Sequence, residues 1–359
     1  MVSNRQALWV ALVGALLLVV AVSGCERVRG RLIDMAADRA VAGDNRDWLD
    51  DGAMHVILCG TGSPLPDPDR AAACTAVIVG GRLFLVDSGP GSWENVQLWG
   101  LPRAELSAVL LTHFHSDHIG ELGEVILQSW VGGRSRPLIV YGPPGVERVV
   151  GGFQEAYALD AHYRISHHGR EVLPVEGARA IPRPLRMPPG QSSMLVLDDG
   201  KVRVTAFVVD HEPVSPAYGY RFDAGGRSVV ISGDTAVSEN LVRSASGADL
   251  LVHEALAAHL VEPLSQAIGE RGDKRLARMT SDILDYHATP GQAVDAASGA
   301  GVDTLVLSHI VPPPARPIVR RMIMRGAKGD WGGNLILGND GMHFRLPADS
   351  DEIQRDDLN

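Results

Sequence analysis

The residues of this chain that are best suited to chemistry form one short run, Thr112-His113-Phe114-His115-Ser116-Asp117-His118. The run places four potential metal ligands within six positions: His113, His115, Asp117 and His118. Neutral imidazole and carboxylate are the ligands that zinc and similar divalent ions prefer. A core would not tolerate so many polar groups without partners. The run therefore predicts a metal site rather than a solvated histidine-rich loop.

Alternating strand and helix candidates surround this run. Apolar, β-prone stretches predict strands at residues 54–58, 75–79, 83–86, 108–111, 138–141, 202–209, 228–231, 250–252 and 304–307. Helices are predicted at residues 120–130, 145–160, 238–244 and 290–299. Gly80-Gly81 marks a hairpin, and strands that then alternate with helices predict a layered α/β architecture with mixed sheets.

Two segments depart from this alternation. Residues 162–200 are rich in proline and histidine and are predicted to be an irregular excursion. Residues 256–286 are predicted to be an inserted, solvated and helical segment. Segments of this kind often line or cover a site.

The His-x-His-x-Asp-His run resembles the signature of the metallo-β-lactamase superfamily. This resemblance implies a four-layered αββα sandwich with mixed sheets, and a site completed by residues that follow later strands, namely His211, Asp234 and His309. It implies one metal ion held by His113, His115 and His211, and a second held by Asp117, His118 and His309. Asp234 would bridge the two ions, which are expected to be Zn²⁺, because neighbouring dications repel and need a shared anion.

Shorter motifs resemble the ribonuclease Z-like branch of that superfamily, which also contains arylsulfatases: Gly60-Thr61-Gly62, Leu85-Val86-Asp87-Ser88-Gly89, Gly219-Tyr220-Arg221-Phe222, Val252-His253-Glu254-Ala255 and His287-Ala288-Thr289. In that branch a Glu and a His cooperate in proton transfer, which maps onto Glu254 and His287. Asp117 is expected to orient the nucleophile while it binds its metal. Asp87 is expected to accept a hydrogen bond from a ligand histidine.

The remaining histidines lie outside these motifs. His253 is expected to pack or to orient rather than to bind metal. The others are expected to be surface or structural residues: His55, His162, His167, His168, His259 and His343. Of these, His162, His167 and His168 are the candidates for contact with substrate.

Composition limits the function further. The chain has 359 residues, 45% of them hydrophobic, and a formal net charge of -10. An acidic surface argues against a general nucleic-acid binder, because phosphate contacts need clustered Lys and Arg. The spacings of Cys25, Cys59 and Cys74 match neither a zinc knuckle nor a disulfide framework, so no catalytic role is expected for them.

The first 25 residues are typical of a secretory signal, because Arg5 precedes an apolar run and small residues lead to Cys25. The tetrapeptide that ends at Cys25 resembles a bacterial lipobox, and an uncleaved membrane anchor is the alternative. Both interpretations predict an exported protein, held at the membrane and facing the periplasm or the cell exterior. Residues 26–52 would then be a tether, 53–347 the hydrolase domain and 348–359 a polar tail.

The expected activity follows from the site and from one missing feature. Only 22 residues separate His211 from Asp234, which leaves no room for the tRNA-grasping arm that ribonuclease Z carries there. The sequence after His309 also lacks the Ser and Arg of tRNA-processing members. The prediction is therefore an exported binuclear hydrolase that cleaves phosphate or sulfate esters of small or medium-sized molecules through a metal-bridging hydroxide, and tRNA is not the expected substrate.

Two alternatives stay open at this point. The same site could hydrolyse carboxylic esters, lactones or lactams, because a metal-activated hydroxide also attacks carbonyl carbon. The chain could instead be a non-catalytic exported metal-binding protein. A homodimer is left open as well.

Overall fold

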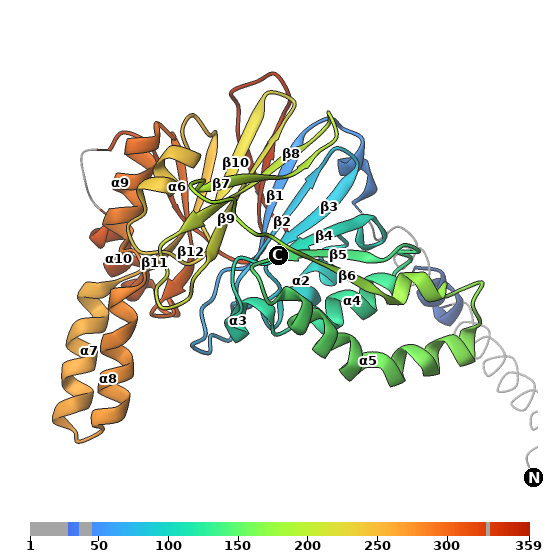
Figure 1. Cartoon of the computed structure of the whole chain (residues 1–359), viewed down its shortest axis with the longest axis horizontal. Helices are drawn as coiled ribbons and strands as arrows, with labels where there is room; N and C mark the ends of the chain where they lie inside the picture. The colour runs from blue at the N-terminus through green and yellow to red at the C-terminus, as the bar shows by residue number, and fades with distance from the viewer. Residues whose placement is uncertain (1–27, 36–44, 328–330) are drawn as a thin grey trace, which may run out of the picture. The chain divides into compact units, whose positions relative to one another are not determined.

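The computed structural model describes residues 28–35, 45–327 and 331–359 (Figure 1). Residues 28–35 are helical, and the fold is carried by a separate unit that begins at Asn45. The predicted signal segment, residues 1–25, lies outside the described residues, as does part of the predicted tether.

The first sheet has eight strands in the order β15-β14-β1-β2-β3-β4-β5-β6. Its strands from β3 to β6 run parallel, and the other pairs are antiparallel. The predicted hairpin joins β2 to β3 through Gly80 and Gly81, which both have positive φ. The strands are β1 (Met54–Gly60), β2 (Cys74–Val79), β3 (Arg82–Val86), β4 (Leu106–Leu110), β5 (Leu138–Gly142), β6 (Ala180–Pro184), β14 (Met342–Leu346) and β15 (Gln354–Asp357).

The second sheet has seven strands in the order β13-β12-β11-β10-β9-β8-β7. Its strands from β10 to β13 run parallel, and those from β7 to β10 are antiparallel. The strands are β7 (Ser193–Asp198), β8 (Arg203–Val209), β9 (Ala217–Ala224), β10 (Arg227–Ile231), β11 (Leu250–Leu256), β12 (Thr304–Val311) and β13 (Asn334–Leu337).

Helices cover the outer face of each sheet (Figure 1). On the first sheet these are α2 (Ser92–Leu98), α4 (Leu122–Val131) and α5 (Val146–His168). On the second sheet they are α6 (Glu239–Ser244), α9 (Pro290–Ala300) and α10 (Pro317–Gly326). A hairpin of α7 (Ala258–Glu270) and α8 (Lys274–Asp282) projects beside them. Short helices complete the described part: η1 (Arg46–Leu49), η2 (Arg103–Glu105), α3 (Ser116–Ile119), η3 (Val175–Ala178) and η4 (Ile283–Asp285).

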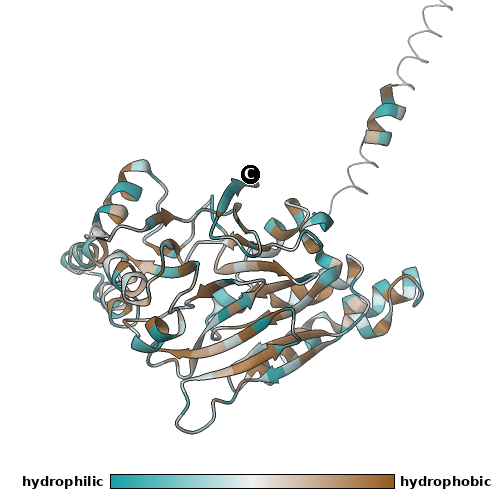
Figure 2. Ribbon diagram, turned by 90° about the horizontal axis from the view of Figure 1, so that it is seen from above, coloured by the Kyte–Doolittle hydropathy of each residue, from teal (hydrophilic) through white to brown (hydrophobic). Residues whose placement is uncertain are grey.

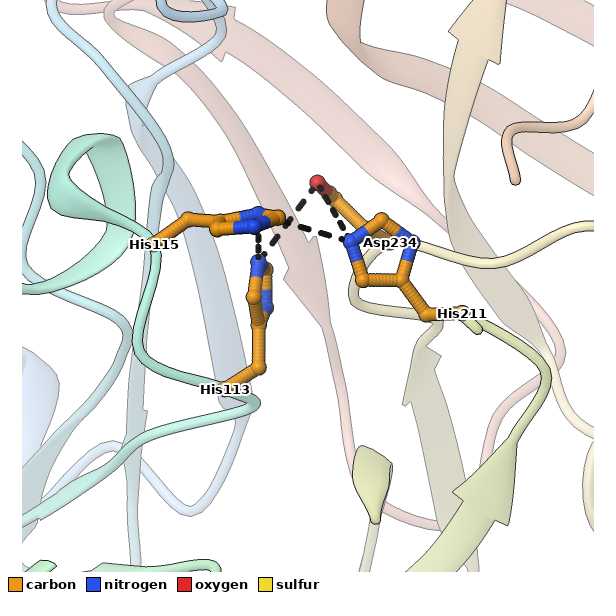
Figure 3. A group of neighbouring side chains, drawn as sticks. All are labelled: His113, His115, His211 and Asp234. Carbon is orange, nitrogen blue, oxygen red and sulfur yellow. Dashed lines mark hydrogen bonds and ion pairs between the residues drawn. The ribbon is translucent and has the colours of Figure 1, made fainter. Parts of the chain in front are cut away.

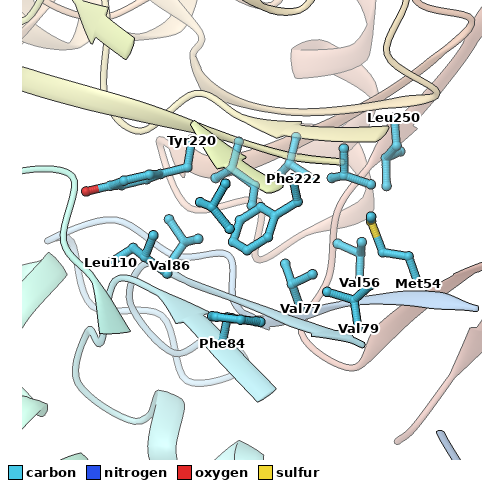
Figure 4. Packing of buried hydrophobic residues seen from close by; sticks show 14 of the residues in the cluster. Met54, Val56, Val77, Val79, Phe84, Val86, Leu110, Tyr220, Phe222 and Leu250 are labelled. Carbon is cyan, nitrogen blue, oxygen red and sulfur yellow. The ribbon is translucent and has the colours of Figure 1, made fainter. Parts of the chain in front are cut away.

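Alternation along the strands decides which layer each side chain enters. In β1, Val56 and Leu58 enter the core between the sheets, whereas Ile57 packs under the helices. Successive strand residues point to opposite faces, and both faces are covered here, so every residue of β1 is buried. Figure 4 shows Phe84 of the first sheet opposite Phe222 of the second, with ring centroids 5.7 Å apart. The strands are accordingly largely hydrophobic in Figure 2.

These layers confirm the predicted αββα sandwich with two mixed sheets. The expected irregular excursion at residues 162–200 is wrong in part, since α5 continues to His168 and the segment then forms β6 and β7. The predicted insertion at residues 256–286 is helical, as α7 and α8. Within the expected polar tail, β15 pairs antiparallel with β14.

The cysteines also differ from expectation. Cys59 at the end of β1 and Cys74 at the start of β2 form a disulfide. Their spacing of 15 residues matched no known framework, but the antiparallel pairing of β1 with β2 brings the two residues together. Cysteine spacing alone does not reveal such a pairing.

Candidate metal centre

The candidate ligands lie at the carboxyl ends of strands from both sheets. His113 and His115 follow β4, His211 follows β8, and Asp234 follows β10. His309 lies near the carboxyl end of β12. Because β10, β11 and β12 run parallel, their carboxyl ends meet at one edge, where open α/β sheets bind their ligands.

The first ligand group converges on His115 (Figure 3). His115 Nδ1 lies 2.9 Å from His113 Nε2 and 3.5 Å from His211 Nε2. Two of these histidines, His113 and His211, are buried, whereas His115 is exposed. The three nitrogens therefore face one small space that is open to solvent on the His115 side.

The second group is formed by Asp117, His118 and His309, which are all buried. Asp117 Oδ2 lies 3.1 Å from His309 Nε2 and 3.6 Å from His118 Nε2. The short helix α3 (Ser116–Ile119) carries both Asp117 and His118, so one helical turn supplies two of the three donors.

Asp234 lies between the two groups. Its Oδ2 atom is 3.8 Å from His113 Nε2 and 3.9 Å from His211 Nε2 on one side. On the other side it is 3.3 Å from His118 Nε2 and 3.5 Å from His309 Nε2. Burial would raise the pKa of Asp234, but His118 and His309 hold it well below its usual range. A single carboxylate oxygen thus reaches both groups.

The donor set fits divalent metal ions. Among the buried side-chain atoms of the described residues that have no hydrogen-bond partner are His118 Nε2 and Asp234 Oδ1. Buried polar atoms are normally paired, so these two need a further partner. Imidazole nitrogens and carboxylate oxygens are the donors that such ions take.

Neighbouring groups fix the direction of the ligand rings. His118 Nδ1 donates to Asp87 Oδ2 at 2.8 Å, and Asp87 is itself held by the backbone and hydroxyl of Thr112. His211 Nδ1 donates to the carbonyl oxygen of Tyr286 at 3.0 Å. Because each Nδ1 carries the proton, the Nε2 lone pair is presented to the site.

Unusual backbone conformations mark the same place. Asp87 has φ of 62° and His309 has φ of 46°, in the left-handed region that residues with a side chain rarely adopt. Gly233, directly before Asp234, has φ of 62°, and a Cβ there would meet the carbonyl oxygen of Tyr218 at 2.7 Å. The chain therefore accepts local strain where it positions the site residues.

Glu254 and His287 form a pair beside the ligands. His287 Nδ1 lies 2.9 Å from Glu254 Oε1, and Glu254 is 2% exposed. The ring of His287 is stacked with that of His309 at 5.6 Å between centroids. Burial would lower the pKa of His287, but the Glu254 carboxylate raises it to about 9. His287 can thus hold a proton next to the ligand cluster.

The structure brings all nine candidate residues of the sequence analysis together, and it adds Tyr286, which no motif indicated. His253 is buried, bonds the carbonyl oxygen of Glu254 and belongs to neither ligand group. His162, His167 and His168 are exposed on α5, where the ring of His162 contacts Tyr163 and the rings of His167 and His168 contact each other.

Comparisons with known proteins agree with this geometry. The model of a family described as "Beta-lactamase superfamily domain" matches residues 82–310. A ribonuclease Z of Mycobacterium bovis is 38% identical over 292 residues, which cover 80% of this chain and 96% of that protein. Human tRNase Z, short form, has a TM-score of 0.57 at 22% identity and covers 82% and 99% of the two chains. A metallo-β-lactamase fold protein of Bacillus subtilis has a TM-score of 0.56 at 21% identity, with coverage of 82% and 99%.

The ribonuclease Z relatives contradict the expected exported hydrolase of phosphate or sulfate esters of the arylsulfatase type. They also contradict the exclusion of tRNA, since proteins of that name align with most of this chain. The short interval between His211 and Asp234 is therefore no ground for excluding RNA.

The match to ribonuclease Z relatives also contradicts the expected membrane attachment and exported location. Their basis, residues 1–25, lies outside the described residues. Across the described part of the chain, none of the helices has both the length and the apolar character of a membrane span.

The ligand geometry and the relatives agree on the class of reaction. Divalent metal ions fit the donor set, and the relatives are hydrolases of phosphodiesters, which are ester bonds. The expectation of a non-catalytic binding protein is therefore not retained. The chain belongs to the metallo-β-lactamase superfamily, in its ribonuclease Z-like branch, and is a metal-dependent hydrolase of ester bonds.

Proposed function

We propose that this chain is a zinc-dependent phosphodiesterase that hydrolyses RNA, with two metal ions in its site. The observation that carries the proposal is the position of Asp234 Oδ2, which lies within 3.9 Å of histidine nitrogens from both ligand groups. A carboxylate shared in this way suits two dications, whose mutual repulsion it reduces. The name of the relatives supports RNA as the substrate class.

In this proposal each ligand group holds one ion. His113, His115 and His211 would bind the first, and Asp117, His118 and His309 would bind the second. Zinc is favoured because the donors are histidine nitrogens and aspartate oxygens, which are usual ligands of catalytic zinc. When bound, such ions lower the pKa of water toward neutrality and neutralise charge on the phosphoryl oxygens.

The residues around the ions would handle orientation and protons. Asp117 Oδ2 lies in the second group and would accept a hydrogen bond from the attacking water. The leaving oxygen of a ribose is a poor leaving group that needs a proton. His287 would supply it from Nε2, because its Nδ1 is engaged by Glu254. Glu254 would keep that ring protonated and fixed in direction.

The test combines metal analysis with a substrate panel on the full chain. Elemental analysis of the zinc-loaded protein should give close to two equivalents. The panel contains an RNA with a 3′ extension, bis(p-nitrophenyl) phosphate, p-nitrophenyl phosphate and p-nitrophenyl sulfate. We expect cleavage of the RNA and of the diester, with much slower turnover of the monoester and the sulfate.

Asp234→Asn removes the shared charge and keeps the shape of the side chain. We expect it to retain at most one equivalent of zinc. Loss of an outer partner of a ligand already costs up to roughly 100-fold, so loss of the shared ligand itself should cost more than that in activity. Asp295→Asn, an exposed position on α9, is the matched control. An Asp234→Asn protein with two equivalents and full activity would rule out the bridged site, and a wild type that cleaves the sulfate but not the diesters would rule out the phosphodiesterase.

A further inference from the structure

Tyr286 occupies a place beside the reacting groups that the proposed mechanism does not use. Its ring centroid lies 5.2 Å from that of His211, a candidate metal ligand, and 4.8 Å from that of His287, the candidate acid. The backbone carbonyl of Tyr286 also accepts the hydrogen bond that orients His211. The side chain is thus tied in position at the edge of the site.

The ring is nevertheless available for a further contact. It meets His211 at 83° and His287 at 48°, so neither histidine lies parallel over it. Tyr286 is half-buried, and within the described part of the chain its hydroxyl makes no hydrogen bond. A buried tyrosine usually has a hydrogen-bond partner for its hydroxyl. The hydroxyl of Tyr286, which lies partly exposed at the edge of the site, is free to take a partner from a bound ligand.

The neighbouring segment holds this ring in a fixed place. Tyr286 follows η4 (Ile283–Asp285), where Ile283 and Leu284 pack on a buried cluster of Leu256, Val261 and Val311. That cluster joins the base of the α7–α8 hairpin to the strands β11 and β12. A flat ring that is already fixed loses little conformational freedom when a planar ligand lies on it.

We propose that Tyr286 is a stacking platform for the nucleobase next to the phosphodiester that is cleaved. This inference rests on the proposed function, because it assumes a nucleotide in the site. A base is separated from its phosphate by one sugar, so a phosphate at the ligand groups leaves the adjoining base near the rim formed by Tyr286. Bases of single-stranded RNA are bound mainly by stacking on aromatic side chains, which tolerates any base sequence.

The experiment compares two diesters that share a leaving group, thymidine 5′-(p-nitrophenyl phosphate) and methyl p-nitrophenyl phosphate. One carries a base and the other does not. Tyr286→Leu should lower kcat/KM about 5- to 150-fold more for the nucleoside diester than for the methyl diester, through KM, as expected for loss of one base–aromatic contact. Tyr286→Phe should restore most of this preference, because it keeps the ring.

Tyr163→Leu is the matched control, because Tyr163 is 61% exposed on α5 and its ring contacts that of His162. It should leave the ratio of the two substrates unchanged. Equal losses for both diesters in Tyr286→Leu would show that Tyr286 only positions His211, and would overturn the inference alone. A wild type that hydrolyses neither diester would overturn the proposed function and the inference with it.

Discussion

Glu254 holds His287 through one oxygen atom that also accepts from two backbone amides. Glu254 Oε1 lies 2.9 Å from His287 Nδ1, 3.0 Å from the amide nitrogen of Ala288 and 3.2 Å from that of Thr235. The two backbone amides hold the Glu254 carboxylate in position independently of His287, and the carboxylate in turn orients the His287 ring. This arrangement leaves His287 Nε2 as the nitrogen from which a proton can reach the leaving oxygen.

The acid role predicts an effect that depends on the leaving group. His287→Ala should slow hydrolysis of diesters with an alkyl leaving group by roughly 100- to 10,000-fold, the usual contribution of a general acid. It should slow release of p-nitrophenolate much less, because that oxygen needs no proton to leave. Steady-state rates on a series of diesters with leaving groups of increasing pKa measure this difference.

Two further variants test whether the pair acts as a unit. Glu254→Gln should show the same dependence more weakly, and the double variant should lose less than the two single losses combined. His162→Ala, exposed on α5, is the control histidine. If His287→Ala lost the same factor for every leaving group, the acid role would be excluded.

At this scale the sequence predicts side chains better than backbone. The roles of the seven ligand candidates, of Glu254 and of His287 could be predicted because their side-chain types and motif positions indicate metal binding or proton transfer. The hydrogen bond from His211 to the backbone carbonyl of Tyr286 could not be predicted in this way, because every residue has a backbone carbonyl. The left-handed φ of His309 is equally invisible before the chain is folded.

The helix α9 shows how an element holds the acid in place. It begins directly after the His287-Ala288-Thr289 motif, with Thr289 as its N-cap and Pro290 as its first residue. The Thr289 hydroxyl accepts from the amide of Gln292, and the Gln292 side chain accepts from the amide of Thr289. Both bonds satisfy amides that the helix itself leaves unpaired.

Thr289→Ala should therefore destabilise the protein by about 1 kcal/mol, the usual cost of a lost N-cap. Urea unfolding of the zinc-loaded protein measures the change as a lower midpoint with an unchanged slope. Thr289→Ser keeps the hydroxyl and should retain most of the stability. Equal unfolding midpoints for wild type and Thr289→Ala would show that the capping box contributes nothing here.

Most central strands could be predicted from the sequence, but the central strands β9 and β14 and all four edge strands could not. β4, β10 and β12 are mostly apolar and almost entirely buried because both of their faces are covered. β6 lies at the edge of its sheet and contains Pro182 and Pro184, which are tolerated there because an edge strand has amides that need no ladder partner. The same prolines made the segment look irregular.

At the scale of the whole domain, a cluster of three stacked rings joins the first strand, β1, to the strand β14 near the end of the chain. His343 of β14 and His55 of β1 are stacked against each other, and both stack on Trp48 of η1. His55 Nδ1 lies 2.9 Å from His343 Nε2, and His55 Nε2 lies 3.1 Å from Asp51 Oδ1. Burial lowers the pKa of both rings and so favours their neutral forms, in which His343 donates to His55 and His55 donates to Asp51.

The cluster was predicted only as two structural histidines, since no local pattern links residues that are 288 positions apart. Burial and the neighbouring His55 lower the pKa of His343 to about 4, from an ordinary value of 6.5. Other charges face the ring as well: Asp356 and Asp51 oppose this shift, and Arg345 adds to it. Of the two histidines, 5% of His343 and 0% of His55 are exposed.

The lowered pKa fixes the sign of a pH effect on stability. Between about pH 6.5 and pH 4 the unfolded chain binds a proton at His343 that the folded chain does not, so the stabilisation present above pH 6.5 is lost as the pH falls through this window. The full effect is on the order of 3 kcal/mol.

The variant His343→Gln tests this effect, because the glutamine amide can still donate a hydrogen bond to His55 but does not titrate. The free energy of unfolding of the wild type, minus that of His343→Gln, should therefore decrease by about this amount from pH 7 to pH 4 in urea titrations. A difference that stays constant over that range would show that His343 is protonated equally easily in both states, and that burial in the stack does not keep it neutral.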